Sequence, residues 1–261
     1  MSVCPDQEAA LGASSAVSPA EPSAVSSTRA YDRMIGMTAI SASAYIDAIA
    51  HLPAGATLIL PDVEWDDYQR LVDENIGRHS SVRITYDRGR LEVISPTSEH
   101  DHLADMCTLI AHVLGEETGA DVESFGSTTF KQTRLLKGAE PDACFYVQTA
   151  SSVIGKRNLD LATDPPPDVM VEIDISHDST TKLAIYASMG VAEAWRYDGR
   201  HNETHIYHLK DGAYVEMTNS IAFPTLTSAV LAEFLEQSNA NGQTATLRAL
   251  RLWVRQNSGS R

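Results

Sequence analysis

The stretch VMVEIDI, residues 169–175, is a strand-like run of apolar residues interrupted by two acids, Glu172 and Asp174. Because side chains alternate across a strand, both acids project from one face and their apolar neighbours from the other. A second run, EPDACFY at residues 140–146, places Asp142 at the start of another apolar strand. Ionised acids are seldom fully buried unless they are paired or bind a metal. The two runs therefore predict a divalent-cation site at the edge of a sheet.

The rest of the chain alternates strands with helices. Apolar and alternating runs predict strands at about 82–86, 91–95, 121–125, 128–132, 142–147, 168–175, 192–197, 203–208 and 213–217. Apolar residues three and four apart predict a long helix over 98–118, and further helices are expected at about 63–72 (with Asp62 as N-cap), 180–189, 228–237 and 244–256. This order predicts a mixed sheet with helices on its faces, in one α/β domain.

Composition limits the class of protein. Residues 1–38 are rich in Ser, Ala and Pro and are expected to be a disordered tail, whereas 39–261 are expected to form a single domain. The chain has no apolar run long enough to span a membrane and no signal-peptide pattern, and its three cysteines form no CxxC pair. These features predict a cytoplasmic protein. The net charge of −15 argues against tight nonspecific binding of nucleic acid, because phosphate binding relies on Lys and Arg.

Further charged residues complete a candidate site. Glu92 interrupts the apolar run at 91–95, and Lys182 lies in the helix expected after the second acidic strand. Acids that converge repel each other unless a cation neutralises them, and Mg²⁺ (or Mn²⁺) binds one or two carboxylates while keeping several waters. We therefore expect Glu92, Asp142 and Glu172 to hold the metal, with the Ile173 carbonyl as a further candidate ligand. Lys182 would orient the attacking water or steady the charge on the phosphate.

The same stretches carry a resemblance to a known family. The chain resembles the Uma-two family of endonucleases, which belongs to the PD-(D/E)XK restriction-endonuclease-like superfamily. The matching stretches, in order between about residues 80 and 200, are LEVISPTSEHDHLADM, STTFKQ, EPDACFY, DPPPDVMVEIDIS and TTKLAIYASMGVAEAWRYD. The resemblance implies a restriction-endonuclease-like mixed β-sheet flanked by helices, a divalent-metal site and nuclease activity on DNA.

Two parts of the superfamily motif have counterparts here, and a third is displaced. Pro141-Asp142 matches the PD of the motif, and Glu172 matches its (D/E). The position two residues further on, where the motif has lysine, holds Asp174 instead. The resemblance points to Lys182 on the following helix as the replacement, with Lys131 as the rival if Lys182 does not reach the acids.

The resemblance also points to auxiliary residues. Glu92 matches the early acid of the family, and His100 matches a histidine that follows its Ser-Pro. Asp174 is an auxiliary candidate, with a helix cap as its alternative role. For Glu92 the structural alternative is a hairpin residue that pairs with Arg83 or Arg90.

Two functions stay open at this point. The leading expectation is a Mg²⁺-dependent endonuclease that hydrolyses phosphodiester bonds of DNA. The alternative is a catalytically degenerate nuclease-fold protein that acts as an interaction module, which the net charge and the displaced lysine favour. We also expect a homodimer, because members of this fold often dimerise and the strands between 192 and 217 carry the aromatic residues Trp195, Tyr197 and Tyr207.

Overall fold

The computed structural model describes residues 48–78 and 82–257. The tail predicted at 1–38 lies outside the described residues. Within those two ranges, no helix is both long enough and apolar enough to cross a membrane.

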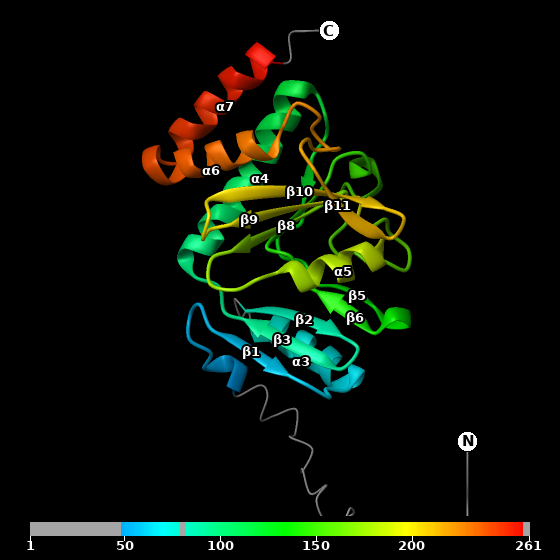
Figure 1. The fold of residues 1–261 in the computed structure, drawn as a ribbon. Coiled ribbons are helices and arrows are strands. Elements are labelled where there is room, and N and C mark those ends of the chain that lie inside the picture. Colours follow the sequence, from blue (N-terminus) through cyan, green and yellow to red (C-terminus); the bar gives the residue numbers. More distant parts are fainter. Residues whose placement is uncertain (1–47, 79–81, 258–261) are drawn as a thin grey trace, which may run out of the picture. The chain divides into compact units, whose positions relative to one another are not determined.

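The first part of the described chain builds an antiparallel sheet of five strands (Figure 1). Its strand order is β1 (Thr57–Leu60), β3 (Arg90–Ile94), β2 (Arg83–Asp87), β6 (Lys137–Ala139) and β5 (Phe130–Gln132), and helix α3 (Trp65–Arg78) packs on it. Tyr68 of α3 packs in one buried cluster with Ile84 and Leu91 of the sheet. Thr85 and Glu92, which are directly opposite each other in the β2–β3 register, therefore face away from α3.

The second part builds a mixed sheet of six strands. Its strand order is β11 (Ala213–Met217), β10 (Glu203–Lys210), β9 (Glu193–Asp198), β8 (Val169–Asp174), β7 (Ala143–Tyr146) and β4 (Glu123–Ser124). Strands β8 and β9 are parallel, and the other neighbours are antiparallel. A parallel pair needs a crossover, which here is α5 (Thr180–Met189).

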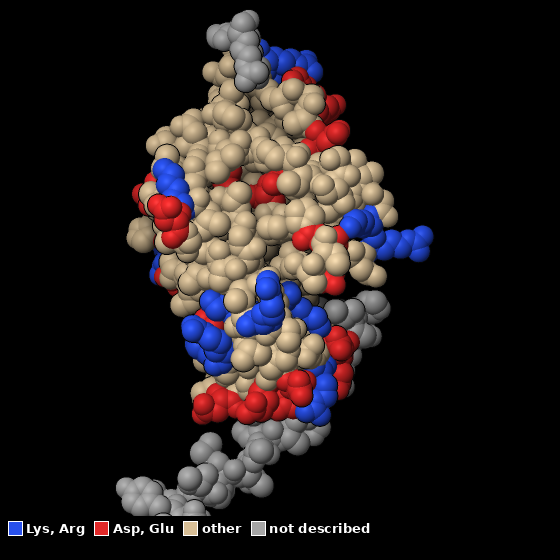
Figure 2. Space-filling view, turned by 90° about the vertical axis from the view of Figure 1, so that its right-hand side faces the viewer, with Lys and Arg blue, Asp and Glu red and all other residues tan. Residues whose placement is uncertain are grey.

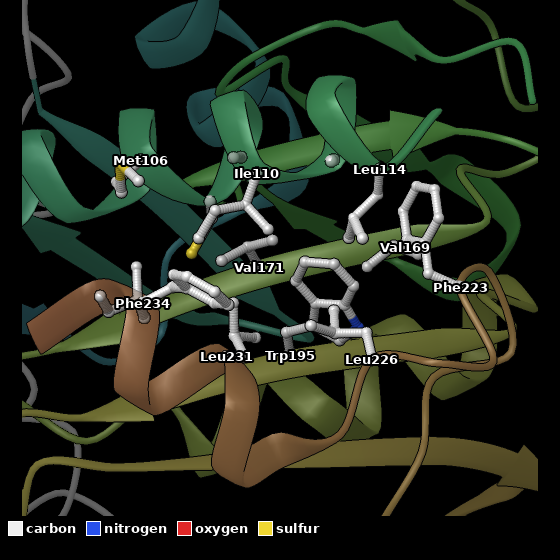
Figure 3. Close-up of a cluster of buried hydrophobic side chains, with 14 of the residues drawn as sticks. Met106, Ile110, Leu114, Val169, Val171, Trp195, Phe223, Leu226, Leu231 and Phe234 are labelled. Atoms are coloured by element: carbon white, nitrogen blue, oxygen red, sulfur yellow. The ribbon is translucent and has the colours of Figure 1, made fainter. Parts of the chain in front are cut away.

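Helices cover both faces of this second sheet. The main core lies against α4 (Ser98–Thr118), α6 (Ser228–Asn241) and α7 (Gln243–Asn257). Figure 3 shows Ile110 of α4, Val171 of β8 and Leu231 of α6 converging there around Trp195. On the opposite face, Tyr186 of α5 packs in a separate cluster with Met170 of β8 and with Phe130 of the first sheet. Both sheets therefore meet at α5.

The α/β class, with sheets flanked by helices, is confirmed, as are the helices at 98–118 and 180–189. The expected mixed sheet is present as the six-stranded sheet, but the strands fall into two sheets, and β1 and β6 were not foreseen. The chain leaves the first sheet at Glu140-Pro141, where proline has no N–H with which to continue a ladder. The N-cap predicted at Asp62 is also wrong, because its φ is 55° and α3 begins at Trp65.

The aromatic residues expected at a dimer interface lie mostly in the core. Trp195 and Tyr197 are 1% and 5% exposed and belong to the main hydrophobic cluster, so they cannot form an interface. Both faces of β9 are covered by other elements, which the alternation of its sequence did not reveal. The homodimer stays a prediction: light scattering at micromolar concentration should give twice the mass of one chain, and the mass of a single chain would contradict it.

Gly138 of β6 allows α3 to approach the first sheet closely. A Cβ at this position would lie 1.9 Å from the Tyr68 hydroxyl and 2.6 Å from its Cζ. We expect Gly138→Ala to lower the free energy of unfolding by about 3 kcal/mol, the upper end of the usual cost of overpacking, in urea melts. Tyr68→Phe is the control: its buried hydroxyl has no hydrogen-bond partner among the described residues, so its loss should cost less than about 0.5 kcal/mol. Wild-type stability of Gly138→Ala would disprove the close approach.

Candidate active site

Asp142 lies where the chain passes from the first sheet to the second. Its amide donates to the Val171 carbonyl at 3.0 Å, and its Oδ2 accepts from the Ile173 amide at 2.7 Å. Both partners belong to β8 and flank Glu172 in sequence. The backbone thus fixes the Asp142 carboxylate beside the strand that carries the second acid.

Two basic side chains approach the Asp142 carboxylate. His100, in the first turn of α4, is 2% exposed, and its Nε2 lies 3.0 Å from Asp142 Oδ2. Neither ring nitrogen of His100 makes a well-aligned hydrogen bond with any residue that the structure describes. Arg83, at the start of β2, places Nε 3.9 Å from Asp142 Oδ1 and Nη2 3.6 Å from Asp101 Oδ1. The structure therefore brings His100, an auxiliary candidate from the family resemblance, to Asp142.

Glu172 is fully buried in β8, and both of its carboxylate oxygens have donors. Lys182 Nζ lies 2.8 Å from Oε2 and also donates to the Glu140 carbonyl at 3.3 Å. The Tyr186 hydroxyl donates to Oε1. Lys182 and Tyr186 are four residues apart in α5 and so share one face of the helix. The structure thus places Lys182, rather than Lys131, at the second acid.

Burial and neighbouring charges shift the pKa values of these groups. Burial raises the pKa of Glu172, although the Lys182 ammonium opposes this effect. Burial alone would lower the pKa of Lys182, but the Glu172 and Asp142 charges raise it above its ordinary value. Burial alone would raise the pKa of Asp142, but His100 and Lys182 lower it. Burial opposes protonation of His100, yet Asp142 raises its pKa. Together these shifts favour an ionised Asp142 beside a protonated Lys182.

Asp174 holds the loop that leads into α5. Both of its oxygens accept from the Ser179 amide, at 3.1 and 3.2 Å, and Arg196 Nε lies 2.5 Å from Oδ2. This ties the start of α5 to the end of β8 and so positions the helix that carries Lys182. Within the described ranges Asp174 makes no hydrogen bond to Asp142 or to the other site carboxylates.

Neither Glu92 nor Lys131 contacts Asp142 or Glu172 among the described residues, although the Glu92 charge helps to raise the pKa of Lys182. Arg90 Nη1 lies 2.6 Å from Glu92 Oε2, so the hairpin pairing that was the structural alternative is present. Lys131 Nζ lies 3.8 Å from Asp73 of α3. Among the described residues, no three His, Cys, Asp or Glu side chains are placed to hold one metal ion. The expected set of three carboxylate ligands therefore stays a prediction, and in this structure the Glu92 carboxylate is engaged by Arg90, its neighbour on the same strand.

Asp142 and Glu172 remain as candidate ligands, and their chemistry suits a hard divalent cation. Two carboxylates are enough for Mg²⁺ or Mn²⁺, which complete their shells with water. Each carboxylate oxygen has two lone pairs, so the oxygens of Glu172 that accept from Lys182 and Tyr186 keep capacity for a metal. The donor set therefore fits a two-carboxylate site.

An open pocket of about 560 Å³ leads to Asp142. Its walls come from the N-terminal half of α4, from Arg83 and from the turn at Gly126-Ser127. Neither Glu172 nor Lys182 is among the residues that line it. A ligand in this pocket would therefore meet Asp142 before the buried pair behind it.

Sequence reasoning missed three participants. Tyr186 could have been found from its spacing, because it lies four residues after Lys182 on one helix face. Glu140, next to Pro141 in an apolar run, is a buried acid whose Oε2 accepts from the Ile84 amide at 2.8 Å, and burial raises its pKa. Arg83 carries no comparable signal, because its partner is remote in the chain.

The chain is similar to known proteins over most of its length. Over residues 65–257, well over half of its length, the chain matches the Uma2 family, described as "Putative restriction endonuclease". A solved structure described as a putative nuclease belonging to DUF820, from Anabaena variabilis ATCC 29413, is similar with a TM-score of 0.43 and 16% sequence identity, over 58% of this chain and 90% of that chain. No curated protein matches the chain. The chain belongs to the Uma2 family of putative restriction endonucleases.

Proposed function

We propose that the protein is a Mg²⁺-dependent endonuclease that hydrolyses phosphodiester bonds of DNA, and that it acts in the cytoplasm as a homodimer. Family membership supports a nuclease. The observation that carries the proposal is the buried ion pair of Lys182 with Glu172, at 2.8 Å. Glu172 belongs to β8, the strand whose Ile173 amide also holds the Asp142 carboxylate. Buried charges are costly to desolvate, and such perturbed groups beside a pocket are typical of functional sites. The free, buried thiols of Cys107 and Cys144 suit a reducing compartment.

The residues of the site would divide the work as follows. Asp142 and Glu172 would hold Mg²⁺, which when bound polarises a phosphate oxygen and lowers the pKa of a water molecule. The Ile173 amide and His100 would hold the Asp142 carboxylate in a fixed orientation toward the metal. Lys182 would hold Glu172 in place and supply a fixed positive charge where negative charge develops on the phosphate.

A second candidate is a catalytically degenerate nuclease-fold protein that acts as an interaction module. The observation in its favour is that the buried carboxylate of Glu172 already has both oxygens engaged, by Lys182 and Tyr186, while Glu92 pairs with Arg90. Such an arrangement needs no metal to balance its charges. Metal-dependent turnover separates the two candidates.

Cleavage of supercoiled plasmid DNA tests the proposal. The wild type is incubated with Mg²⁺ or Mn²⁺, with EDTA as one control and the Lys182→Met variant as the other. Nicked or linear DNA should form only with metal and only with the wild type. Equal metal-dependent products from both proteins would show that Lys182 is not the cation of the site, and intact plasmid in every metal would favour the interaction module.

A further inference from the structure

One end of the first sheet carries a basic surface, although the net charge of the chain is −15. We define this surface by Arg88 of the β2–β3 turn and by Arg134 and Lys137 of the hairpin that β5, η1 (Thr133–Leu135) and β6 form. The Arg88 amide donates to the Leu136 carbonyl at 2.9 Å, which joins the turn to the hairpin. Figure 2 shows Lys and Arg side chains gathered over the lower half of this face, with acidic side chains below them.

Nearby acids neutralise this surface only in part. Arg88 Nε lies 2.8 Å from Asp87 Oδ1, and Lys137 Nζ lies 3.9 Å from the same oxygen. Arg134 is exposed and makes no ion pair with any residue that the structure describes. Arg88 and Lys137 thus share one carboxylate while Arg134 has none within the described ranges, so the three cations together can attract an anion.

An apolar side chain stands among these cations. Leu136 is 42% exposed, and its φ of 49° is unfavourable for a leucine. The Leu136 backbone closes the turn, since its amide donates to the Thr133 carbonyl and its carbonyl accepts from the Arg88 amide, but its exposed side chain adds nothing to the core. Backbone strain of this kind tends to occur at functional positions. Apolar side chains flanked by cations are a device by which proteins contact bases in a DNA groove.

The basic surface lies near enough to the site to hold the same molecule. Five residue steps separate Lys137 from Asp142, which span at most about 18 Å when fully extended. Base pairs repeat every 3.4 Å or so, making this span about five base pairs long. Strand β2 also joins the two places, because Arg83 at its start lines the pocket at Asp142 and Arg88 follows its end.

We propose that Arg88, Arg134 and Lys137 bind the phosphate backbone of double-stranded DNA and that Leu136 contacts bases in a groove. The inference rests on the proposed function, since the same duplex would be cut at Asp142. Phosphate contacts fix the register of a protein on the duplex and read no sequence. The surface positions the substrate and takes no part in bond cleavage.

Salt-dependent binding tests the basic surface. Fluorescence anisotropy measures the affinity for a duplex of about 20 base pairs in EDTA, between about 50 and 200 mM KCl. The test variant carries Arg88→Gln, Arg134→Gln and Lys137→Gln. The matched control carries Arg157→Gln, Lys210→Gln and Arg248→Gln, three exposed cations elsewhere. The slope of log K against log[salt] should fall by about three in the test variant and by less than about one in the control. Equal slopes in both variants would overturn the proposal.

Leu136→Gly tests the groove contact. Glycine tolerates a positive φ, so this variant should keep the stability of the wild type. Its affinity for the duplex should fall about fivefold or more, the scale of one apolar side chain that leaves an interface. Unchanged affinity would remove Leu136 from the interface.

A small substrate separates this inference from the proposed function. Hydrolysis of bis(p-nitrophenyl) phosphate in Mn²⁺ should have the same kcat/KM in the wild type and the test variant, because a small diester does not reach the basic surface. Plasmid cleavage should fall at least about tenfold in the test variant alone. Undiminished plasmid cleavage by the test variant would overturn the proposed DNA-binding surface but not the proposed nuclease function. A wild type that binds no DNA and cleaves neither substrate overturns the function itself. Binding to anionic vesicles instead of DNA, lost in the test variant, would assign the surface to a membrane.

Discussion

Replacing Lys182 by methionine should slow DNA cleavage in Mn²⁺ by about a hundredfold or more, the scale on which one electrostatic stabiliser acts. The ammonium is buried 2.8 Å from Glu172, and no other lysine of the described chain is known to contact that carboxylate. The substitution should also lower the free energy of unfolding by about 3 kcal/mol, because it leaves Glu172 in the interior without its cation. Plasmid cleavage and urea unfolding measure the two effects.

A double variant separates chemistry from stability. Lys182→Met combined with Glu172→Gln removes both charges, and the amide oxygen of glutamine can still accept from Tyr186. We expect its stability to return to within about 1 kcal/mol of the wild type, because no uncompensated charge remains. Its cleavage should stay lost. Recovery of cleavage would mean that the single variant fails only because it unfolds, and undiminished cleavage by Lys182→Met would mean that the cation of the site lies elsewhere.

The centre of this site could be predicted from the sequence because an acid in an apolar strand requires a partner. Asp142 and Glu172 each met that condition, and the structure supplies a partner for each. The position of Lys182 came from the family resemblance rather than from the strand pattern. Asp174 explains this position physically, because its carboxylate accepts from the Ser179 amide and so sets where α5, the helix of Lys182, begins.

The features that could not be predicted depend on contacts between distant segments. The strands β1 and β6 are short, and their pairing with β3 and β2 has no local signal. The division into two sheets follows from Pro141. The sequence shows that a proline interrupts the hydrogen bonds of a strand, but it does not show which strands pair on either side of it. Trp195 suggested an interface because a strand pattern does not show which faces other elements cover. The Arg90–Glu92 pair was one of the weighed alternatives, and only geometry decided in its favour.

The same geometry predicts that Asp142 and Glu92 differ in their effect on metal binding. Asp142 lines the pocket, whereas Glu92 is engaged by Arg90 at 2.6 Å. In calorimetric titrations with Mn²⁺, Asp142→Asn should weaken binding by at least about a hundredfold, because losing a direct ligand costs more than the tenfold to hundredfold typical of an outer-shell partner. Glu92→Gln should change the affinity less than about twofold, since Arg90 already engages the Glu92 carboxylate and keeps it from a direct ligand role.

Asp142 and Glu92 form a matched pair, because each substitution replaces one buried carboxylate with its amide. Equal losses in both variants would restore the three-carboxylate set and would require Arg90 to release Glu92 when metal binds. No loss in either variant would place any bound metal away from β8 and would favour the interaction module. Loss in Asp142→Asn alone, together with inactive Lys182→Met, would fit one arrangement. Two carboxylates would hold the cation, and Lys182 would supply the positive charge that the superfamily motif has at the position of Asp174.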